Sequence, residues 1–385
     1  MARMVIRTGT VFILLIHTVS VAATVTLNTS VDGEDGLSWH DIRHFDVEGK
    51  GWIDTISFYD RLPARAMTLV REPVWDLSHH SAGMCVRFVT DANEIQARWE
   101  LRSNSLAMPH MPATGVSGLD LYVKDTNGKW KWLAVGRPTQ FPINSVILVK
   151  DITESTREYL LYLPLYNGVL SVEVGVPKGS AFRKASPYPK DRKPIVFYGT
   201  SITQGGCASR TGMVHTAILG RRLNYPVINL GFSGNGRMEP EMADLLAELE
   251  PSVYVLDCLP NMNGKMVAER VAPFVKKLRE VHPETPILLV EDRTYSDAFL
   301  VKLRQLRNTE NRRELSRTYS RLRSEGVKHL HYLSGGQLLD GDKDNLATVD
   351  GSHPTDLGFM RQADAFYDVL EPILFSSCEP GSLSQ

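Results

Sequence analysis

Residues 195–206 read Ile195-Val-Phe-Tyr-Gly-Thr-Ser-Ile-Thr-Gln-Gly-Gly206 and begin the pattern that predicts the fold of the second half of the chain. Its apolar start, residues 195–198, predicts a short buried strand, and glycines and hydroxyl residues follow at once. A serine flanked by small residues at this point can hold its hydroxyl beside free backbone N–H groups, as a nucleophile requires. An ordinary glycine-rich turn has the same composition, so both interpretations stay open for this segment alone. No Gly-Lys-Ser/Thr follows, which excludes a phosphate-binding P-loop.

After residue 206, strand patterns alternate with helix patterns to the end of the chain. Short apolar runs predict strands at residues 227–230, 253–257, 287–290 and 327–333. Apolar residues at helical spacing predict helices over residues 242–249, 267–281 and 360–370. Such alternation is typical of a parallel, doubly wound α/β sheet, whose ligands bind beyond the carboxyl ends of the strands. The loops after the strands are therefore the candidate site.

Three of these loops carry groups that suit acyl chemistry. Gly231 follows the second strand and Asn261 follows the third, and both can offer an N–H group to a developing negative charge. Near the end, Asp350 precedes His353 by three residues in a loop that leads into the last helix. This spacing lets the carboxylate accept the Nδ1–H of the imidazole and leaves Nε2 free as a base for Ser201. Each motif alone has an ordinary interpretation as a turn or a solvated loop, but together they favour one site.

This set of motifs resembles the SGNH, or GDSL-like, hydrolase superfamily. Ser201 matches the serine of its first block, Gly231 the glycine of the second, Asn261 the asparagine of the third, and Asp350 with His353 the Asp-x-x-His of the fifth. The usual Gly-Asp-Ser-Leu is Gly-Thr-Ser-Ile here, and the usual Gly-x-Asn-Asp is Leu-Pro-Asn-Met. The resemblance implies a flavodoxin-like domain with a parallel five-stranded sheet, a Ser-His-Asp triad, and an oxyanion hole made by the N–H groups of Ser201 and Gly231 and the amide of Asn261.

The same resemblance implies hydrolysis of carboxylic esters, often small acyl groups such as acetyl on carbohydrates, with no metal and no organic cofactor. Two alternatives remain open. An acyltransferase would use the same residues and differ only in the acceptor. A noncatalytic carbohydrate-binding protein would use aromatic residues of the first half, such as Trp130 and Trp132, which are also typical core residues. The expected ligand is a small-molecule or polysaccharide ester.

The first half of the chain has a different pattern. Residues 41–176 alternate apolar and polar side chains, and Asn-Gly pairs at 127–128 and 167–168 predict two β-hairpins. Many short strands without long helices predict a β-sandwich. Gly118-Leu-Asp-Leu-Tyr122 resembles the Gly-x-Asp-Leu-Tyr signature of a β-rich domain that precedes one SGNH subgroup, so we expect the two domains to be structurally coupled. The expected boundaries are a β domain over 24–180, a linker over 181–193 and the catalytic domain over 194–385.

The amino-terminus predicts export. Two arginines precede an apolar stretch that ends at small residues 22–23, which is typical of a cleaved signal peptide over residues 1–23. We therefore expect a secreted or periplasmic protein without stable membrane insertion. The chain has 385 residues with a net charge of −1, so it offers no polybasic field for nucleic acid. The oligomeric state is left open.

Some residues have no clear role in the sequence. A disulfide between Cys207 and Cys258 is one hypothesis, because both follow neighbouring strands, and free buried thiols are the alternative. Histidine pairs at 79–80 and at 329 and 331 have no acidic or cysteine partner at ligand spacing, so no metal site is expected. Residues 291–295 follow the fourth strand and are expected to shape the pocket or cap it.

Overall fold

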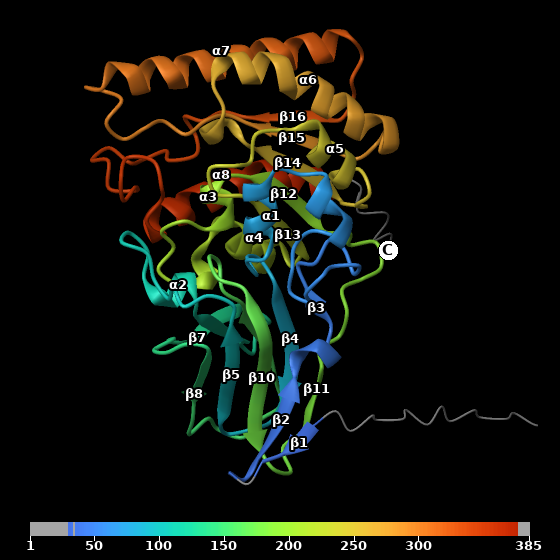
Figure 1. Ribbon diagram of the computed structural model, residues 1–385, viewed down its shortest axis with the longest axis vertical. Coiled ribbons are helices and arrows are strands. Elements are labelled where there is room, and N and C mark those ends of the chain that lie inside the picture. Colours follow the sequence, from blue (N-terminus) through green and yellow to red (C-terminus); the bar gives the residue numbers. More distant parts are fainter. Residues whose placement is uncertain (1–29, 34, 376–385) are drawn as a thin grey trace, which may run out of the picture.

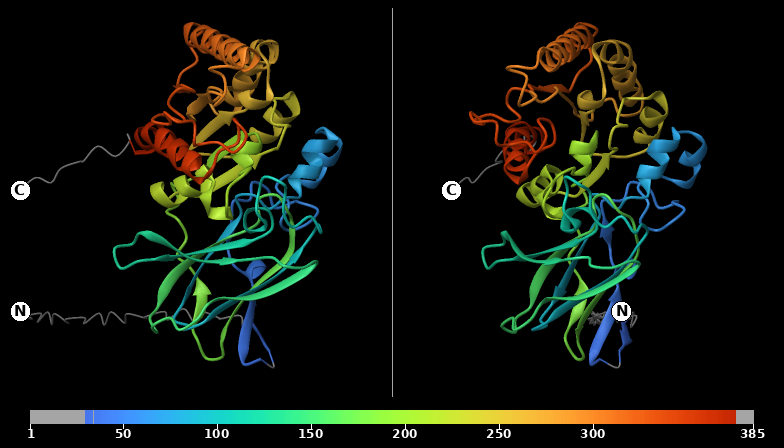
Figure 2. Two further views of the ribbon diagram at one scale, coloured as in Figure 1. Left: turned by 90° about the vertical axis from the view of Figure 1, so that its left-hand side faces the viewer. Right: turned by 60° about the vertical axis from the view of Figure 1, so that its left-hand side comes forward.

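The computed structural model describes residues 30–33 and 35–375, so the predicted signal peptide and Cys378 lie outside the described residues. A β-rich domain forms one end of the molecule and an α/β domain the other (Figure 1). The two further views show the same arrangement from the side, with the termini of the described chain on different domains (Figure 2). No helix among the described residues is long and apolar enough to cross a membrane.

The α/β domain is built on a parallel five-stranded sheet in the order β13-β12-β14-β15-β16. These strands are β12 (Ile195–Gly199), β13 (Val227–Gly231), β14 (Val253–Asp257), β15 (Ile287–Val290) and β16 (Leu330–Leu333). The order is the flavodoxin-like one, in which the chain reverses direction across the sheet at β12. The predicted fold class is therefore confirmed, and the strand-end loops meet at one edge.

Helices cover both faces of this sheet because its buried strands alternate their side chains between two cores. Tyr198 stacks on Phe274, at 5.5 Å between ring centroids, under α5 (Pro240–Leu246), α6 (Gly264–Val281) and α7 (Lys302–Ser324). Phe197 points the other way and meets Phe366, under α4 (His215–Leu223) and α8 (Asp356–Phe375). Helix α7 was not predicted, because it is rich in charged residues and buries few apolar side chains.

The β domain is a sandwich of two antiparallel sheets around one core. One sheet has the order β1-β2-β10-β5-β8 and the other β11-β4-β9-β6-β7, with β3 beside β4. In β5 every second residue is buried, as the alternation predicted, and Trp99 lies at the centre of the shared core. The strands are β1 (Ser30–Asp32), β2 (Leu37–Asp41), β3 (Val47–Glu48), β4 (Cys85–Thr90), β5 (Ile95–Leu101), β6 (Leu119–Lys124), β7 (Trp130–Gly136), β8 (Ile143–Val149), β9 (Arg157–Tyr162), β10 (Val169–Pro177) and β11 (Phe182–Lys184).

Short helical segments connect these elements. In the β domain they are η1 (Ile42–His44), η2 (Ala64–Thr68), α1 (Glu72–Ser78) and α2 (Ala113–Val116). In the α/β domain they are α3 (Ser201–Gln204), η3 (Thr211–Met213) and η4 (Leu259–Asn261). Helices α1 and α2 lie at the end of the sandwich that faces the α/β domain (Figure 1).

Two details of the β domain differ from the sequence-based expectation. The Asn127-Gly128 hairpin joins β6 to β7 as predicted, but the second predicted hairpin is wrong, because β9 and β10 belong to different sheets. The Asn167 side chain is buried and forms hydrogen bonds with the backbone of Ser103 and the hydroxyl of Ser117. It therefore stabilises the connection by which the chain passes from β9 in one sheet to β10 in the other. The predicted linker also begins with β11, which pairs with β4 and so belongs to the sandwich.

The Gly118–Tyr122 signature lies where the two domains meet. Asp120, fully buried, accepts hydrogen bonds from Arg210 Nη1 at 2.7 Å and from the backbone N–H of Gly212 at 2.9 Å, both in the α/β domain. The hydroxyl of Tyr122 lies 2.5 Å from the same Arg210 nitrogen. We call Asp120, Tyr122 and Arg210 the interdomain clamp. Because a buried carboxylate needs such partners, the signature ties the two domains together.

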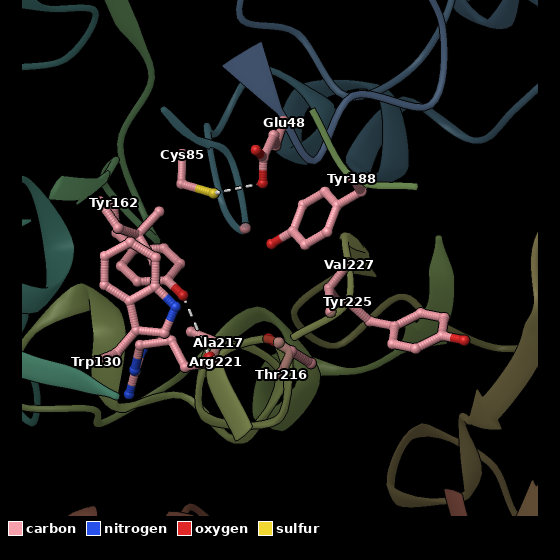
Figure 3. Close-up of a pocket in the computed structure, with 13 residues that line it drawn as sticks. Glu48, Cys85, Trp130, Tyr162, Tyr188, Thr216, Ala217, Arg221, Tyr225 and Val227 are labelled. Carbon is pink, nitrogen blue, oxygen red and sulfur yellow. Dashed lines mark hydrogen bonds between the residues drawn. The ribbon is translucent and has the colours of Figure 1, made fainter. Parts of the chain in front are cut away.

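A small pocket also lies at this interface (Figure 3). Its volume is about 30 Å³, which is room for about one water molecule. The thiol of Cys85 and the carboxylate of Glu48 lie on one side of it, and Thr216 of α4 lies on the other. Burial raises the pKa of the Cys85 thiol well above its usual range. The cavity is too small for an ester substrate and holds none of the residues predicted to be catalytic.

Candidate active site

The residues that the motifs singled out gather at the carboxyl edge of the parallel sheet. Ser201 is the first residue of α3, directly after β12, and Thr200 caps this helix by accepting the N–H of Ile202. Asn261 ends η4 after β14. His353 and Asp350 lie in the loop before α8. The fold places them together because parallel strands end at the same edge.

A hydrogen-bonded chain joins three of these residues. Ser201 Oγ lies 2.8 Å from His353 Nε2, and His353 Nδ1 lies 2.7 Å from Asp350 Oδ2. The side chain of His353 is 24% exposed and that of Asp350 is 44% exposed, so the acid is open to solvent. With Nδ1 protonated toward the acid, Nε2 is left to accept the serine proton.

The acid is held by its own loop. Asp350 Oδ1 accepts the backbone N–H groups of Ser352 at 3.0 Å and His353 at 2.8 Å. Partial burial acts to raise the pKa of Asp350, but the hydrogen bonds from His353 and Ser352 outweigh it and lower the pKa below its usual value. Gly351 between them has φ +87°, a conformation that favours glycine. The carboxylate is therefore ionised and oriented at neutral pH.

The predicted oxyanion donor Gly231 is engaged elsewhere. Its N–H donates to the side-chain oxygen of Asn229 at 2.9 Å. A methyl group added at Gly231 would lie 2.1 Å from the backbone nitrogen of Gln204, so glycine is needed there for the close approach of α3. Gly234, with φ +69° and open space beside it, is different, because its N–H has no acceptor among the described residues. It is the better candidate donor in this loop.

Asn261 is bound to the same loop. With its amide oriented so that Oδ1 accepts the N–H groups of Asn235 at 3.0 Å and Gly236 at 3.2 Å, Nδ2 remains as a donor at the other end. The backbone N–H of Ser201 has no acceptor among the described residues either. Three N–H donors, from Ser201, Gly234 and Asn261, are therefore candidates for binding an oxyanion.

Residues of the β domain form hydrogen bonds with α3, the helix that carries Ser201. The hydroxyl of Tyr166 donates to the backbone oxygen of Ser201 at 3.1 Å, and the amide of Gln204 in α3 donates to His80 Nδ1 at 2.9 Å. Burial lowers the pKa of His80 to about 3, so the ring is neutral and can accept this bond. These contacts could not be predicted from the sequence, because their partners come from distant loops.

A buried arginine of the β domain holds the neighbouring strand. The Arg61 guanidinium donates to the backbone oxygens of Gly231 at 2.7 Å and Asn229 at 3.1 Å. Burial lowers the pKa of Arg61 to about 9. The β domain thus contacts both α3, which carries Ser201, and the end of β13.

The remaining candidates lie at the edge of the site or below it. Glu291 accepts the N–H of Gly335 at 2.7 Å and caps that loop, whereas Arg293 forms a buried two-bond ion pair with Asp257 at 3.0 and 2.8 Å. Thr203 of α3 donates to the same Asp257 at 3.1 Å. Residues 291–293 therefore support the floor of the site.

The proposed disulfide is absent, since Cys207 and Cys258 are both free thiols. Cys258 belongs to the core on one face of the sheet, whereas Ala208, next to Cys207, belongs to the core on the other face. The described residues contain no group of three or more histidine, cysteine, aspartate or glutamate side chains that could hold a metal ion.

Exposed Trp132 donates its indole N–H to Asp120, and Trp130 lines a groove of about 850 Å³ beside the clamp.

Both domains of the chain match models of known protein families. The model of the GDSL-like lipase/acylhydrolase family matches residues 192–371, and the GxDLY model, described as the N-terminus of SGNH-hydrolase-type esterases, matches residues 37–182. A solved structure described as a GDSL-like lipase from Bacteroides ovatus is 33% identical, with a TM-score of 0.82 over 88% of this chain and 98% of that one.

Two more distant structures share the fold. The salicylyl-acyltransferase SsfX3 from a tetracycline biosynthetic pathway is 18% identical, with a TM-score of 0.69 over 89% of this chain and 97% of that one. A family two carbohydrate esterase from Cellvibrio japonicus is 14% identical, with a TM-score of 0.54 over 88% and 98%. A search of curated proteins gives no match.

Proposed function

We propose that this chain, which belongs to the GDSL-like lipase/acylhydrolase family, is a serine esterase. We propose that it removes small acyl groups, such as acetyl, from carbohydrates. The observation that carries the proposal is the chain of hydrogen bonds from Ser201 through His353 to Asp350, at 2.8 and 2.7 Å. These are the distances over which a base can take the proton of a nucleophile.

In the proposed mechanism the reaction begins with proton transfer. His353 Nε2 takes the proton of Ser201 as the serine oxygen attacks the carbonyl carbon of the ester. Asp350 stabilises the imidazolium that forms and keeps the ring in the required tautomer, without itself becoming protonated. No step needs a metal or an organic cofactor.

The negative charge that develops on the carbonyl oxygen would be held by N–H donors from two loops and the nucleophile itself. We assign these roles to the backbone N–H groups of Ser201 and Gly234 and to the side-chain amide of Asn261. Gly234 replaces Gly231 in this set because the N–H of Gly231 already donates to Asn229. His353 then protonates the leaving alcohol, and water repeats the sequence on the acyl-enzyme.

The choice of substrate class draws on the relatives. The fold shared with carbohydrate esterases supports carbohydrate esters, and the family supports hydrolysis. We propose further that the protein acts outside the cytoplasm, as the predicted signal peptide indicates. Mass spectrometry of the mature amino-terminus tests this point, and retention of Met1 in a membrane fraction would contradict it.

The test of the activity is hydrolysis of p-nitrophenyl acetate and of acetylated polysaccharides by the purified chain, with Ser201→Ala as the variant. We expect a burst of p-nitrophenol from the wild type and almost none from the variant. Ser324→Ala is a matched control, because Ser324 is exposed at the carboxyl end of α7, away from the site, and this variant should keep the wild-type activity. Equal activity in wild type and Ser201→Ala would refute the proposal.

Acyl transfer is the second candidate, because the chain shares its fold over 89% of its length with an acyltransferase. The same residues would form the acyl-enzyme, and an acceptor alcohol would replace water. Adding sugar acceptors to the ester assay decides between them. Acylated sugar in preference to free acid indicates a transferase, and free acid alone indicates a hydrolase.

A further inference from the structure

We propose that the β domain forms the subsite for the leaving alcohol of the ester, and that His110 recognises an alcohol with several hydroxyl groups. The inference rests on the proposed function: the α/β domain would bind the acyl group of the ester, and the β domain would bind its alcohol. It was not visible in the sequence, where His110 lies in the first half of the chain among residues without a motif.

His110 stands next to the proposed base. It lies between β5 and α2, and its ring centroid is 5.8 Å from that of His353, with the two rings at 60°. The side chain is exposed, and neither of its ring nitrogens has a hydrogen-bond partner among the described residues. A neutral imidazole offers one donor and one acceptor, so two hydrogen-bonding atoms are free beside the base.

The segment that follows His110 packs on the α/β domain. Met108 and Met111 pair through two backbone hydrogen bonds, at 2.9 and 3.0 Å, and so close a tight turn around His110. The hydroxyl of Thr114 donates to the backbone oxygen of Ser209 at 2.5 Å. A methyl group at Gly115 would lie 2.3 Å from the backbone oxygen of Ala208, so the two segments are in close contact. His110 therefore lies in a hydrogen-bonded turn that leads directly into a segment packed on the α/β domain.

The chemistry decides which part of the ester lies there. The base that takes the serine proton must later give it to the leaving oxygen, so the alcohol lies against His353. The acyl oxygen lies at the N–H donors of the α/β domain. His110 lies beside His353 and belongs to the β domain, so we expect it to face the alcohol part of the ester. A vicinal diol, as in a sugar, can pair with both the donor and the acceptor of His110, whereas a nitrophenol has no such hydroxyls.

The experiment compares two esters for each variant: an O-acetylated methyl glycoside, and p-nitrophenyl acetate, whose leaving group has no hydroxyls and needs no proton. For His110→Ala we expect the ratio of kcat/KM on the glycoside to kcat/KM on p-nitrophenyl acetate to fall about tenfold, the effect of roughly one lost hydrogen bond. His110→Gln, which keeps a donor and an acceptor, should recover part of the ratio. His44→Ala, an exposed histidine of η1, serves as the matched control and should leave the ratio unchanged.

Three outcomes would overturn the inference: an equal fall on both esters, which indicates a structural role; no change on either; or a wild type that hydrolyses p-nitrophenyl acetate but no acetylated sugar. The first two leave the proposed function standing, provided that Ser201→Ala abolishes hydrolysis of p-nitrophenyl acetate, whereas the third leaves a serine esterase but rules out carbohydrate esters as its substrates. Activity in Ser201→Ala instead refutes the proposed function itself, so the two failures are distinguishable.

Discussion

Replacing Arg210 by methionine tests whether the interdomain clamp stabilises the protein. Methionine keeps much of the side-chain volume but removes the charge that faces Asp120 at 2.7 Å. The Asp120 side chain is 0% exposed and that of Arg210 is 22% exposed, so the carboxylate cannot turn to water when its partner is lost. The variant thus leaves a buried, unpaired charge.

The size of the effect follows from what remains around Asp120. Breaking a buried ion pair by removing one partner costs about 3–5 kcal/mol of unfolding free energy. Asp120 keeps hydrogen bonds from the N–H of Gly212 at 2.9 Å and the indole of Trp132 at 2.8 Å, so we expect the lower end, about 3 kcal/mol. Arg43→Met is the control, because Arg43 pairs with Asp41 at the surface and should cost less than about 1 kcal/mol.

The pH dependence gives a second measure of the same effect. Burial raises the pKa of Asp120 and Arg210 opposes this, so without Arg210 the folded-state pKa rises further above the unfolded value. When the pKa of a carboxyl group is higher in the folded state than in the unfolded state, the unfolding free energy of the protein falls as the pH rises from the unfolded-state pKa to the folded-state pKa. The deficit of Arg210→Met should therefore be larger at pH 8 than at pH 5.

Urea unfolding of the full chain, followed by tryptophan fluorescence at both pH values, measures the deficit. A loss below about 1 kcal/mol at pH 8 would refute the reasoning. So would a loss of equal size at both pH values, because that would indicate lost packing instead of an unpaired charge.

Four further results are expected. Ser201→Ala and His353→Ala should each abolish turnover almost as fully as the double variant, and additive losses in kcat would show that they do not act together. Asn261→Ala should lower kcat about 10²–10³-fold and change KM far less, whereas a raised KM at constant kcat would argue against an oxyanion role. Gly231→Ala should lower both stability and activity, because the new methyl group would displace α3, and thermal unfolding at the wild-type temperature would contradict this. His215 is fully buried among phenylalanine rings, and neither of its ring nitrogens is hydrogen-bonded within the described part of the chain. Burial holds the pKa of His215 far below its usual value. As the pH falls below about 6.5, the unfolded state therefore binds a proton at this residue that the folded state does not bind, and the protein loses stability. His215→Phe should therefore raise the unfolding free energy by about 1–3 kcal/mol and weaken its decline toward acid pH in urea titrations, and a destabilised variant would show that the ring nitrogens are needed.

Features that depend on local pattern could be predicted from the amino-acid sequence. Strand and helix periodicity predicted the five parallel strands, since a buried strand needs a short continuous apolar run. Asp350 and His353 could be paired from their spacing because a carboxylate three residues away reaches the ring within a single loop. Ser201 was visible because its loop follows the first strand of the sheet.

Features that depend on residues far apart in the chain became visible only in the folded structure. The sequence could not tell that Asn229 occupies the N–H of Gly231, since this depends on how the side chain turns in the folded loop. Nor could it tell that Asn167 would pin a crossing between sheets, because Asn-Gly is also the usual hairpin turn. The place of His110 beside His353 has the same origin: the two residues lie on different domains, and only the packing of one domain on the other brings their rings together.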